Sequence, residues 1–472
     1  MHGRRTQRSG ITVILVLVFM GIFMLLLSGI AGYVFVESKV TRATYVREEA
    51  FQIAESGLEY YRWFLAHDPG DLTDGTGGAG PYVHDAKDAD GGTIGNYALT
   101  ISGNLSCGVL QSVDIVSKGT SADDPTFTRT VEARYAKPSV AEYAYIINDS
   151  VWAGDDRRIT GPYHANGGIR MDGTNNSTVE SSVASWTCTS AFGCDSSTEE
   201  PGVFGTGSGS KYWQYPVPQI DFTGIATDFP TLKSLAQAQG LYFPSVGGGD
   251  QEGYHLVFNS DNTVDVYKVT RTAYISATDI TGNSKRDYDT IRNQTWLGTY
   301  SIPAGCPVIF VEDKAWIEGT IASKVTLIAD DPGSYAPEIL LSDDIDYTKD
   351  DGTVGLTAIA EGDIRVPYGS PYDMTVRGIF VAQTGYFGRD SYGTGDHQGT
   401  LTMTGSIVSN QRVGTKWSYE SCNWWGQCTE TGWSGYDTRV NAYDRALAND
   451  PPPFTPAASQ DSAFVVWKED VR

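Results

Sequence analysis

Cysteines are the side chains best suited to covalent chemistry in this chain, and four of the six lie in two close pairs. Cys188 and Cys194 share one short polar stretch, and Cys422 and Cys428 share another. A local disulfide within each pair is favoured over a zinc site, because no C-x-x-C motif or neighbouring histidine completes a tetrahedral ligand set. Disulfides indicate an oxidising compartment outside the cytoplasm.

The other two cysteines, Cys107 and Cys306, lie far apart in the sequence. They either form a third disulfide or remain free thiols, and the sequence leaves both alternatives open.

Clustered carboxylates are the groups with which polysaccharide lyases and hydrolases perform acid–base catalysis. The densest acidic segment contains Asp343, Asp344, Asp346, Asp350 and Asp351. Turn residues surround this segment and no histidine accompanies it, so a solvated turn is favoured over a catalytic pair. His164 lies near Asn166, but no nucleophile motif of the G-x-S-x-G kind adjoins it. The sequence therefore predicts no catalytic residue, no cofactor and no enzyme activity.

Three aspartates offer the only pattern typical of a metal site. Asp85, Asp88 and Asp90 precede two glycines, and carboxylates spaced in this way can wrap a calcium ion. The twelfth position counted from Asp85 is Asn96, so the terminal glutamate of a complete calcium loop is missing. An acidic turn without metal is the favoured interpretation, and calcium binding is the alternative.

Aromatic side chains gather around the second cysteine pair. They are Trp417, Tyr419, Trp424, Trp425 and Trp433. Surface aromatics of this kind can contact a glycan or a protein ligand. The favoured interpretation is a loop that packs its own aromatic side chains around a disulfide, because a small loop needs its own core.

The composition of the chain predicts the kind of secondary structure that carries these residues. The chain has 472 residues, 53 glycines and a net charge of −23, and short β-branched and aromatic runs alternate with polar turn residues. This texture is typical of an extracellular protein that is mainly β. The negative charge repels phosphate, so no nucleic-acid partner is expected.

One segment near the N-terminus differs from the rest. The 26 residues Ile11–Val36 carry no charge, and Arg4, Arg5 and Arg8 precede them. A helix of this length spans about 39 Å, enough to cross a bilayer, and is too long for the core of a secretory signal peptide. The basic flank stays inside, so a single-pass protein with an extracytoplasmic head is expected in a bacterial cytoplasmic (inner) membrane.

The helical pattern continues beyond the apolar segment. Apolar residues recur at three- and four-residue spacing up to Leu65, and Asp68-Pro69-Gly70 then breaks the helix. An amphipathic stripe needs a partner, and predicted strands at Tyr97–Ser102, Val113–Ser117 and Phe127–Tyr135 can supply it.

The first 137 residues resemble the N-terminal region of PilX-like minor type IV pilins. The resemblance rests on the basic residues, Ser9-Gly10, the long helix and the box Ala54-Glu55-Ser56-Gly57. It implies that a prepilin peptidase cuts after Gly10, that Ile11 becomes the new N-terminus, and that other pilin subunits are partners.

Leu15 departs from the pattern of major pilins, which carry glutamate at the fifth mature position. In the family, that glutamate is thought to neutralise the free amine of a neighbouring subunit, and an unpaired buried charge costs several kcal/mol. Leu15 therefore favours a tip, priming or other minor subunit over a bulk filament subunit. An uncleaved membrane anchor is the alternative.

Residues 138–472 are expected to form a large head. Short apolar strands that end in polar turns recur at irregular spacing, as in Ile309–Asp313, Ala358–Asp363 and Ile379–Gln383. This favours an irregular β-helix or β-solenoid, with a β-sandwich as the runner-up. The region resembles the surface part of large PilX-type and DUF4900-type proteins. Phe464–Trp467 is predicted as a final strand or cap of the solenoid.

Four domains follow: a leader (1–10), a transmembrane helix (11–36), an amphipathic helix with a pilin-like β-sheet (37–137) and the head (138–472). The function expected is that of a structural and interaction protein of the cell surface, a minor pilin in pilus assembly or adhesion. The alternatives are a membrane-tethered, carbohydrate-binding or carbohydrate-active solenoid and an adhesin without filament partners.

Overall fold

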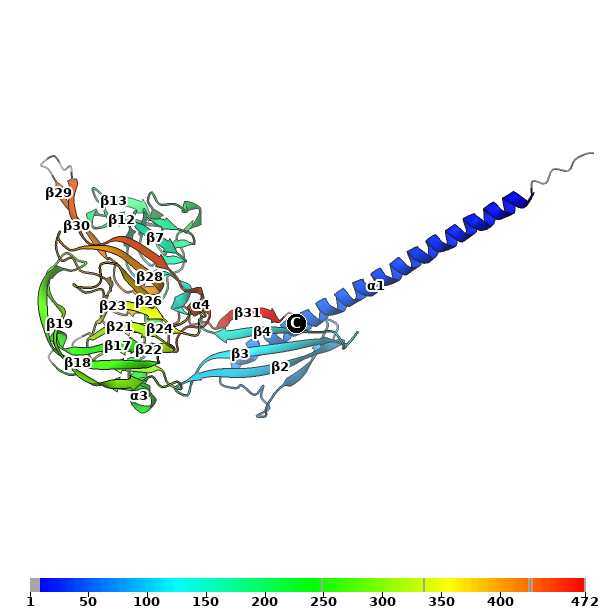
Figure 1. The fold of residues 1–472 in the computed structure, drawn as a ribbon, viewed down its shortest axis with the longest axis horizontal. Helices are drawn as coiled ribbons and strands as arrows, with labels where there is room; N and C mark the ends of the chain where they lie inside the picture. Colours follow the sequence, from blue (N-terminus) through cyan, green and yellow to red (C-terminus); the bar gives the residue numbers. More distant parts are fainter. Residues whose placement is uncertain (1–8, 248, 334–335, 423–424, 426–427, 471–472) are drawn as a thin grey trace, which may run out of the picture. The chain divides into compact units, whose positions relative to one another are not determined.

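The computed structural model describes residues 9–247, 249–333, 336–422, 425 and 428–470. The chain forms two compact units. The first contains Met1–Gly103, Val113–Tyr135 and Val466–Arg472, and the second contains Asn104–Ser112 and Ala136–Val465. The protein is mainly β with one long N-terminal helix, as the sequence predicts (Figure 1).

Helix α1 (Ser9–His67) runs without interruption through the apolar segment and the amphipathic segment. It is long and apolar enough to cross a membrane, and no other helix among the described residues is. It contains no proline, which would break its backbone hydrogen bonds, and the next proline is Pro69, beyond its end. The sequence predicted the end of this helix to within two residues.

A five-stranded sheet belongs to the first unit. Its order is β1 (Tyr82–Lys87), β2 (Thr93–Ser106), β3 (Val109–Ser121), β4 (Thr128–Ala136) and β31 (Ala463–Asp470). The pairs β1–β2 and β3–β4 are antiparallel. β31 contains Phe464–Trp467, so the predicted strand exists, but it does not cap the solenoid. It pairs beside β4, because the exposed edge of that strand offers unpaired backbone groups.

The second half of α1 packs on this sheet. The buried stripe consists of Val46, Ala50, Ile53, Ala54, Leu58, Tyr61 and Leu65. The residues on the opposite face of the helix, including Arg47, Glu48 and Glu59, are exposed. The amphipathic pattern is therefore confirmed, and burial of this stripe supplies the stabilising free energy of the first unit.

The head stacks parallel strands in rungs, and most of them belong to one sheet of 21 strands. One column, in spatial order, contains β16 (Leu241–Phe243), β20 (Val308–Val311), β22 (Lys324–Ala329), β24 (Gly355–Ala360), β26 (Met374–Ala382), β28 (His397–Ser409), β5 (Tyr145–Ile147), β8 (Tyr163–Ala165), β11 (Val179–Ser181) and β15 (Trp213–Gln214). The architecture is solenoid-like.

Further strands belong to the same sheet, and most of them pair in parallel between rungs, apart from antiparallel hairpins. They are β7 (Arg157–Thr160), β10 (Thr174–Asn175), β17 (Gly253–Asn259), β18 (Thr263–Thr278), β19 (Ser284–Ser301), β21 (Ala315–Ile321), β23 (Ile339–Tyr347), β25 (Ile364–Arg365), β27 (Phe387–Gly388), β29 (Lys416–Cys422) and β30 (Cys428–Ala442). Smaller sheets contain β6 (Val151–Ala153), β9 (Ile169–Met171) and β14 (Val203–Phe204), and β12 (Ser185–Cys188) with β13 (Thr198–Pro201). The short helices are α2 (Phe222–Ile225), α3 (Phe229–Gln239) and α4 (Arg445–Asn449).

The rungs do not follow chain order. Tyr145–Ile147 (β5) pairs in parallel with Ile407–Ser409 of β28. The first strand of the head therefore lies in the middle of the stack, beside the strand of that column that comes last in the sequence. In-register positions place Phe310, Ile328, Ile359, Val381, Val408 and Ile146 above one another, and all are buried. This apolar column is the core of the head.

Among the described residues, two disulfides lie in the second unit. Cys107, at the tip of the β2–β3 hairpin, is bonded to Cys306 across 199 residues of sequence, which decides between the two alternatives left open. Cys188 and Cys194 are also bonded. Cys422 and Cys428 face each other in the backbone register of β29 and β30. Their side chains lie outside the described residues, so a bond between them stays a prediction.

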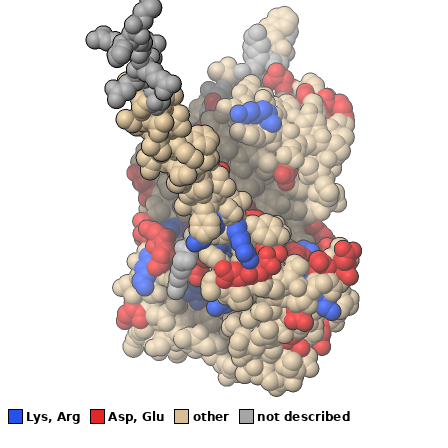
Figure 2. All heavy atoms as spheres, turned by 90° about the vertical axis from the view of Figure 1, so that its right-hand side faces the viewer, with Lys and Arg blue, Asp and Glu red and all other residues tan. Residues whose placement is uncertain are grey.

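Acidic side chains spread over the face of the protein drawn in Figure 2, with fewer basic ones among them. This agrees with the net charge of −23.

Candidate functional site

The first candidate site is the exposed apolar part of α1. Gly10 and Ile11 lie in the first turns, and Ile11 is 75% exposed. Every residue from Ile11 to Val36 is exposed, although nearly all are apolar. Arg4, Arg5 and Arg8 lie outside the described residues. An uncovered apolar surface of this length requires lipid or other helices to cover it.

The predicted box lies where α1 packs tightly against the sheet. A Cβ atom on Gly57 would stand 2.4 Å from Ser117 Oγ and 2.8 Å from Tyr97 Cδ2. Ala54, three residues earlier on the same face, is fully buried. Only small side chains fit at these two positions, which lie one helical turn apart.

The other two residues of the box point away from the closest contact. The Ser56 hydroxyl donates to the Ile53 carbonyl at 2.7 Å, so this hydroxyl has its hydrogen-bond partner within the helix. Burial and the charges of Glu48 and Glu59 raise the pKa of Glu55. The box is therefore a packing motif in which Ala54 and Gly57 carry the steric requirement.

The sheet contributes matching glycines that sequence reasoning missed. A Cβ on Gly119 would stand 2.1 Å from the Ala50 carbonyl oxygen, and a Cβ on Gly95 would stand 2.7 Å from Ile53 Cδ1. Glycine inside a strand often marks a close approach of another backbone, so this signal was present in the sequence.

His164 lies in a polar cluster that resembles a catalytic triad in composition. Its Nε2 atom lies 3.4 Å from Ser182 Oγ, and its Nδ1 atom lies 3.5 Å from Glu180 Oε2. In-register pairing of β8 with β11 brings these residues together, and His164 is buried. Sequence reasoning missed Glu180 and Ser182.

The orientation of Asn166 decides what His164 can do. Asn166 Oδ1 accepts a bond from the Ile220 backbone N–H at 3.0 Å, and its Nδ2 donates to the Ile220 carbonyl at 2.8 Å. Asn166 Oδ1 also lies 3.0 Å from His164 Nε2, so that nitrogen must carry the proton and donate. A protonated Nε2 cannot take a proton from Ser182, so the cluster holds rungs together and does not activate a nucleophile.

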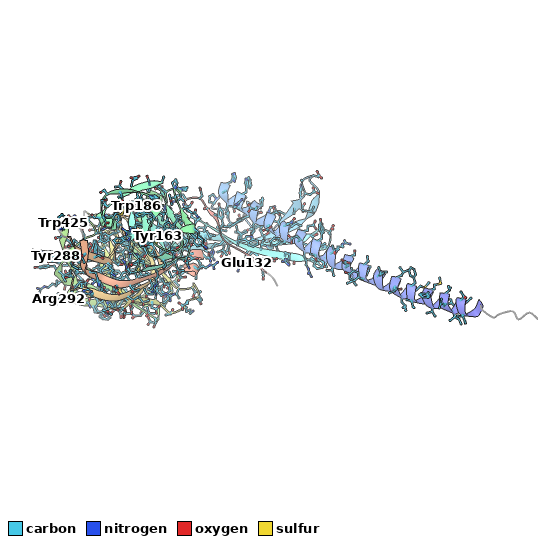
Figure 3. All side chains as sticks on the ribbon, turned by 90° about the horizontal axis from the view of Figure 1, so that it is seen from above. Glu132, Tyr163, Trp186, Tyr288, Arg292 and Trp425 are labelled. Atoms are coloured by element: carbon cyan, nitrogen blue, oxygen red, sulfur yellow. A yellow bond between two sulfur atoms is a disulfide. The ribbon has the colours of Figure 1, made fainter. Side chains whose placement is uncertain are left out.

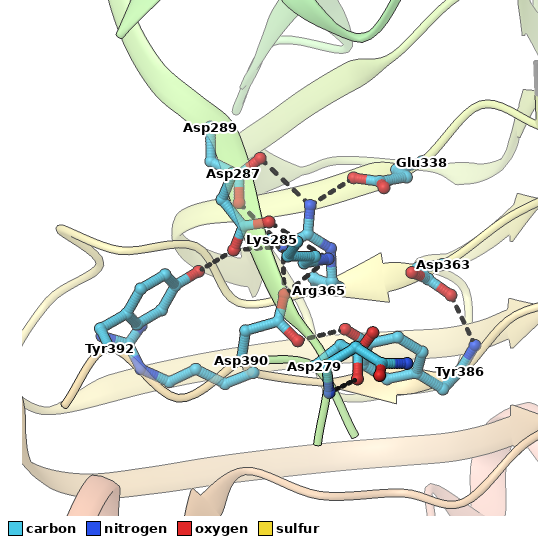
Figure 4. A network of polar contacts seen from close by, with 12 residues as sticks. Asp279, Lys285, Asp287, Asp289, Glu338, Asp363, Arg365, Tyr386, Asp390 and Tyr392 are labelled. Carbon is cyan, nitrogen blue, oxygen red and sulfur yellow. Dashed lines mark hydrogen bonds and ion pairs between the residues drawn. The ribbon is translucent and has the colours of Figure 1, made fainter. Parts of the chain in front are cut away.

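A second buried cluster surrounds Arg365 in β25 (Figure 4). Arg365 donates to Asp289 at 2.9 and 3.1 Å and to Asp390 at 2.9 Å, and it also binds Glu338. Lys285 binds Asp390 at 2.8 Å and Asp287 at 3.1 Å. The residues come from separate strands and loops, and no sequence motif predicts that they lie together.

Carboxylates outnumber cations in this ion cluster. Burial and the charge of Glu338 raise the pKa of Asp363 to about 7. Burial opposes ionisation of Glu338, but the charges of Arg365 and Lys314 outweigh it and hold the pKa of Glu338 below its usual value. Burial also raises the pKa of Asp287, which shares Arg365 with its neighbours. Arg365, Asp289 and Asp390 are buried, and their contacts tie separate strands and loops of the head together.

The acidic segment and the calcium candidates form ordinary surface contacts. Asp346 and Asp350 pair with Arg377. Asp88 accepts bonds from the backbone of Asp90 and of Gly92, which is the geometry of a turn. Within the described ranges, no group of three acidic, histidine or cysteine side chains could hold a metal ion.

The side chains of the predicted aromatic patch differ in their surroundings. Trp417 donates to the Arg389 carbonyl at 2.7 Å, and Trp433 packs edge-on against His397 at 4.1 Å. Trp425 is 72% exposed, whereas Trp424 lies outside the described residues. Trp417 and Trp433 thus contact other parts of the head, whereas the packing of the loop around a disulfide stays a prediction.

No protein-family model matches this chain, and no curated protein matches it either. Among solved structures, the crystal structure of the competence-associated pilin ComZ from Thermus thermophilus is similar at a TM-score of 0.32 and 15% sequence identity. The match covers 90% of this chain and 97% of that chain.

Proposed function

We propose that this protein is a single-pass surface protein of the type IV pilin kind, a PilX-like minor pilin that acts in pilus assembly or adhesion. The observation that carries the proposal is the change in environment along α1. The helix is apolar and uncovered from Ile11 to Val36 and then buries a stripe against its own sheet from Val46 onward.

The two parts of the helix need different partners. The five-stranded sheet covers the apolar stripe of the second part within the protein itself. The first part has no cover among the described residues, so a lipid bilayer or the helices of other pilin subunits must supply one. Because the two parts form one unbroken helix, a subunit can leave the membrane and enter a filament without refolding.

Leu15 supports a minor role. A subunit at the tip of a filament has no amine of a further subunit above it, so it needs no carboxylate at the fifth mature position. Cleavage by a prepilin peptidase between Gly10 and Ile11 belongs to the same proposal, as does location in the bacterial cytoplasmic membrane before assembly.

The mature N-terminus tests this proposal. Mass spectrometry of the protein from native membranes and from sheared surface material should find a methylated Ile11 start. Gly10→Val should abolish processing, whereas Gly32→Val, on the same helix with open space around it, should leave processing intact.

An intact Met1 or His2 start, together with unchanged piliation in a deletion strain, would contradict the pilin part. The protein would then be a membrane-anchored adhesin without filament partners. No observation on the described residues favours the carbohydrate-active alternative.

A further inference from the structure

The long hairpin of β18 and β19 has two faces that differ in charge. Along β19, Asp287 and Asp289 are buried and Lys285 is half-buried, whereas Arg286 and Arg292 are exposed. Successive side chains of a strand point to opposite faces. The strand therefore places both of its acidic residues inside the head and presents arginines outside.

The buried ion cluster fixes the inner face of β19. Asp289 accepts two bonds from Arg365, and Asp287 accepts a bond from the Tyr392 hydroxyl at 3.0 Å. The Trp316 indole donates to the Asp289 carbonyl at 2.7 Å. These contacts hold the strand in one register, so the outer side chains of β19 stand on a rigid support.

The outer face combines cations with aromatic rings. Its members are Lys268, Arg271, Tyr274, Arg286, Tyr288 and Arg292, which we call the basic hairpin face. Tyr274 is 55% exposed. The ring centroids of Tyr274 and Tyr288 lie 5.9 Å apart, and the Arg286 guanidinium lies 4.9 Å from the centre of the Tyr274 ring.

The labelled Tyr288 and Arg292 lie at the outer edge of the head in Figure 3. No acid neutralises this face from within the hairpin strands. Besides Asp287 and Asp289, the two strands contain only Asp265, which binds the Thr299 hydroxyl near the other end of the hairpin. Across the described residues, none of the four cations of the face makes an ion pair with a carboxylate. A positive strip thus lies on a chain whose net charge is −23.

We propose that the basic hairpin face binds an acidic polysaccharide, a chain of sugars that carry carboxylates. Arginine binds carboxylates through paired, charge-assisted hydrogen bonds. The flat apolar face of a tyrosine ring packs against the C–H face of a sugar ring, and its hydroxyl remains in water. This binding role goes beyond the proposed pilin function and does not depend on cleavage at Gly10.

Charge density favours a glycan over nucleic acid. A nucleic-acid strand carries one phosphate about every 3.4 Å, and its binding requires many neutralising contacts. The face offers four cations, and acidic surface repels a dense polyanion beyond it within roughly one Debye length, about 8 Å.

Binding of a labelled hyaluronan oligosaccharide, in which every second sugar carries a carboxylate, to the full-length protein in detergent tests the proposal. We expect salt-dependent binding, with a Kd lower than that for a neutral dextran oligomer or for oligodeoxythymidine. Arg286→Gln with Arg292→Gln should weaken binding roughly tenfold, since each exposed charge contact contributes somewhat under 1 kcal/mol. Tyr274→Ala with Tyr288→Ala should weaken it by a similar factor without changing the charge.

A matched control removes the same charge elsewhere on the head. Arg158 and Lys211 are exposed, and Lys211 also lies over a tyrosine ring, that of Tyr212, at 4.7 Å. Arg158→Gln with Lys211→Gln should leave the Kd within about twofold. An equal loss in this control, tighter binding of the oligodeoxythymidine, equal binding of dextran, or absence of binding at low salt would each overturn the proposal. The unfolding midpoints of all variants, measured in parallel, identify any that fail to fold.

Discussion

Arg365 and Asp289 form a bidentate ion pair inside the head, with Nη1 to Oδ2 at 2.9 Å and Nη2 to Oδ1 at 3.1 Å. Their side chains are 2% and 0% exposed. Arg365 lies in β25 and Asp289 in β19, so the pair ties the long hairpin to the stacked rungs. Removal of one partner leaves the other charge buried and uncompensated, which is far more costly than loss of a surface pair.

Arg365→Met should therefore destabilise the head by about 3–5 kcal/mol, because four carboxylates lose their shared cation. Denaturant unfolding of the full-length protein in detergent measures this. Arg158→Met, at an exposed position, should stay within about 0.5 kcal/mol of wild type. Similar values for the two variants would show that the cluster is solvated in solution.

Stability should decrease as the pH rises from about 4 to about 7. Burial and the neighbouring charge of Glu361 raise the pKa of Asp330 from 3.8 to about 7. The folded state then binds more protons than the unfolded state across this window, so protonation stabilises it below pH 4 and the contribution is lost as the pH passes 7. The pKa of Asp363 is also raised, by burial and by the neighbouring charge of Glu338.

Asp330→Asn mimics the protonated carboxyl and should flatten this decrease, so the variant should be more stable than wild type at pH 8. Unfolding midpoints measured from pH 4 to pH 8 test the slope. Asp155→Asn, at an exposed position, should keep the slope of wild type. A variant at Asp330 with an unchanged profile would refute the assignment.

Gly57→Ala should destabilise the first unit by about 1–3 kcal/mol, because the added methyl group overlaps Ser117 and Tyr97. Ala has the higher helix propensity, so an isolated helix would show the opposite sign. Thermal unfolding followed by circular dichroism distinguishes the two. Ser56→Ala, at the adjacent exposed position, is the control and should be nearly neutral.

The two described disulfides should differ in their contribution to stability. In the chain-entropy account, Cys107–Cys306 closes a loop of 199 residues and contributes about 5 kcal/mol, and Cys188–Cys194 closes one of 6 and contributes about 2 kcal/mol. Unfolding of the Cys107→Ser/Cys306→Ser and Cys188→Ser/Cys194→Ser proteins measures both. Equal losses would mean that native-state contacts, and not loop closure, dominate.

The sequence alone predicted the elements that depend on neighbouring residues. An uncharged run and a three- and four-residue apolar spacing determine α1, because a helix brings residues i and i+4 onto one face. Short apolar runs predicted several rungs, and the predicted segment Ile309–Asp313 overlaps β20. The six-residue spacing of Cys188 and Cys194 likewise predicted their bond. In each case the partners are close in the chain, so local pattern suffices.

Only the tertiary structure decided which distant segments meet. Cys107 with Cys306, β31 beside β4 and Tyr145 with Ile407 are pairings over hundreds of residues. Many strands of similar composition could pair equally well on backbone hydrogen bonds, so register and stacking order follow from packing of the whole core. The ion cluster and the basic hairpin face arise for the same reason, because the inner and outer faces of β19 exist only once the strand lies on the head.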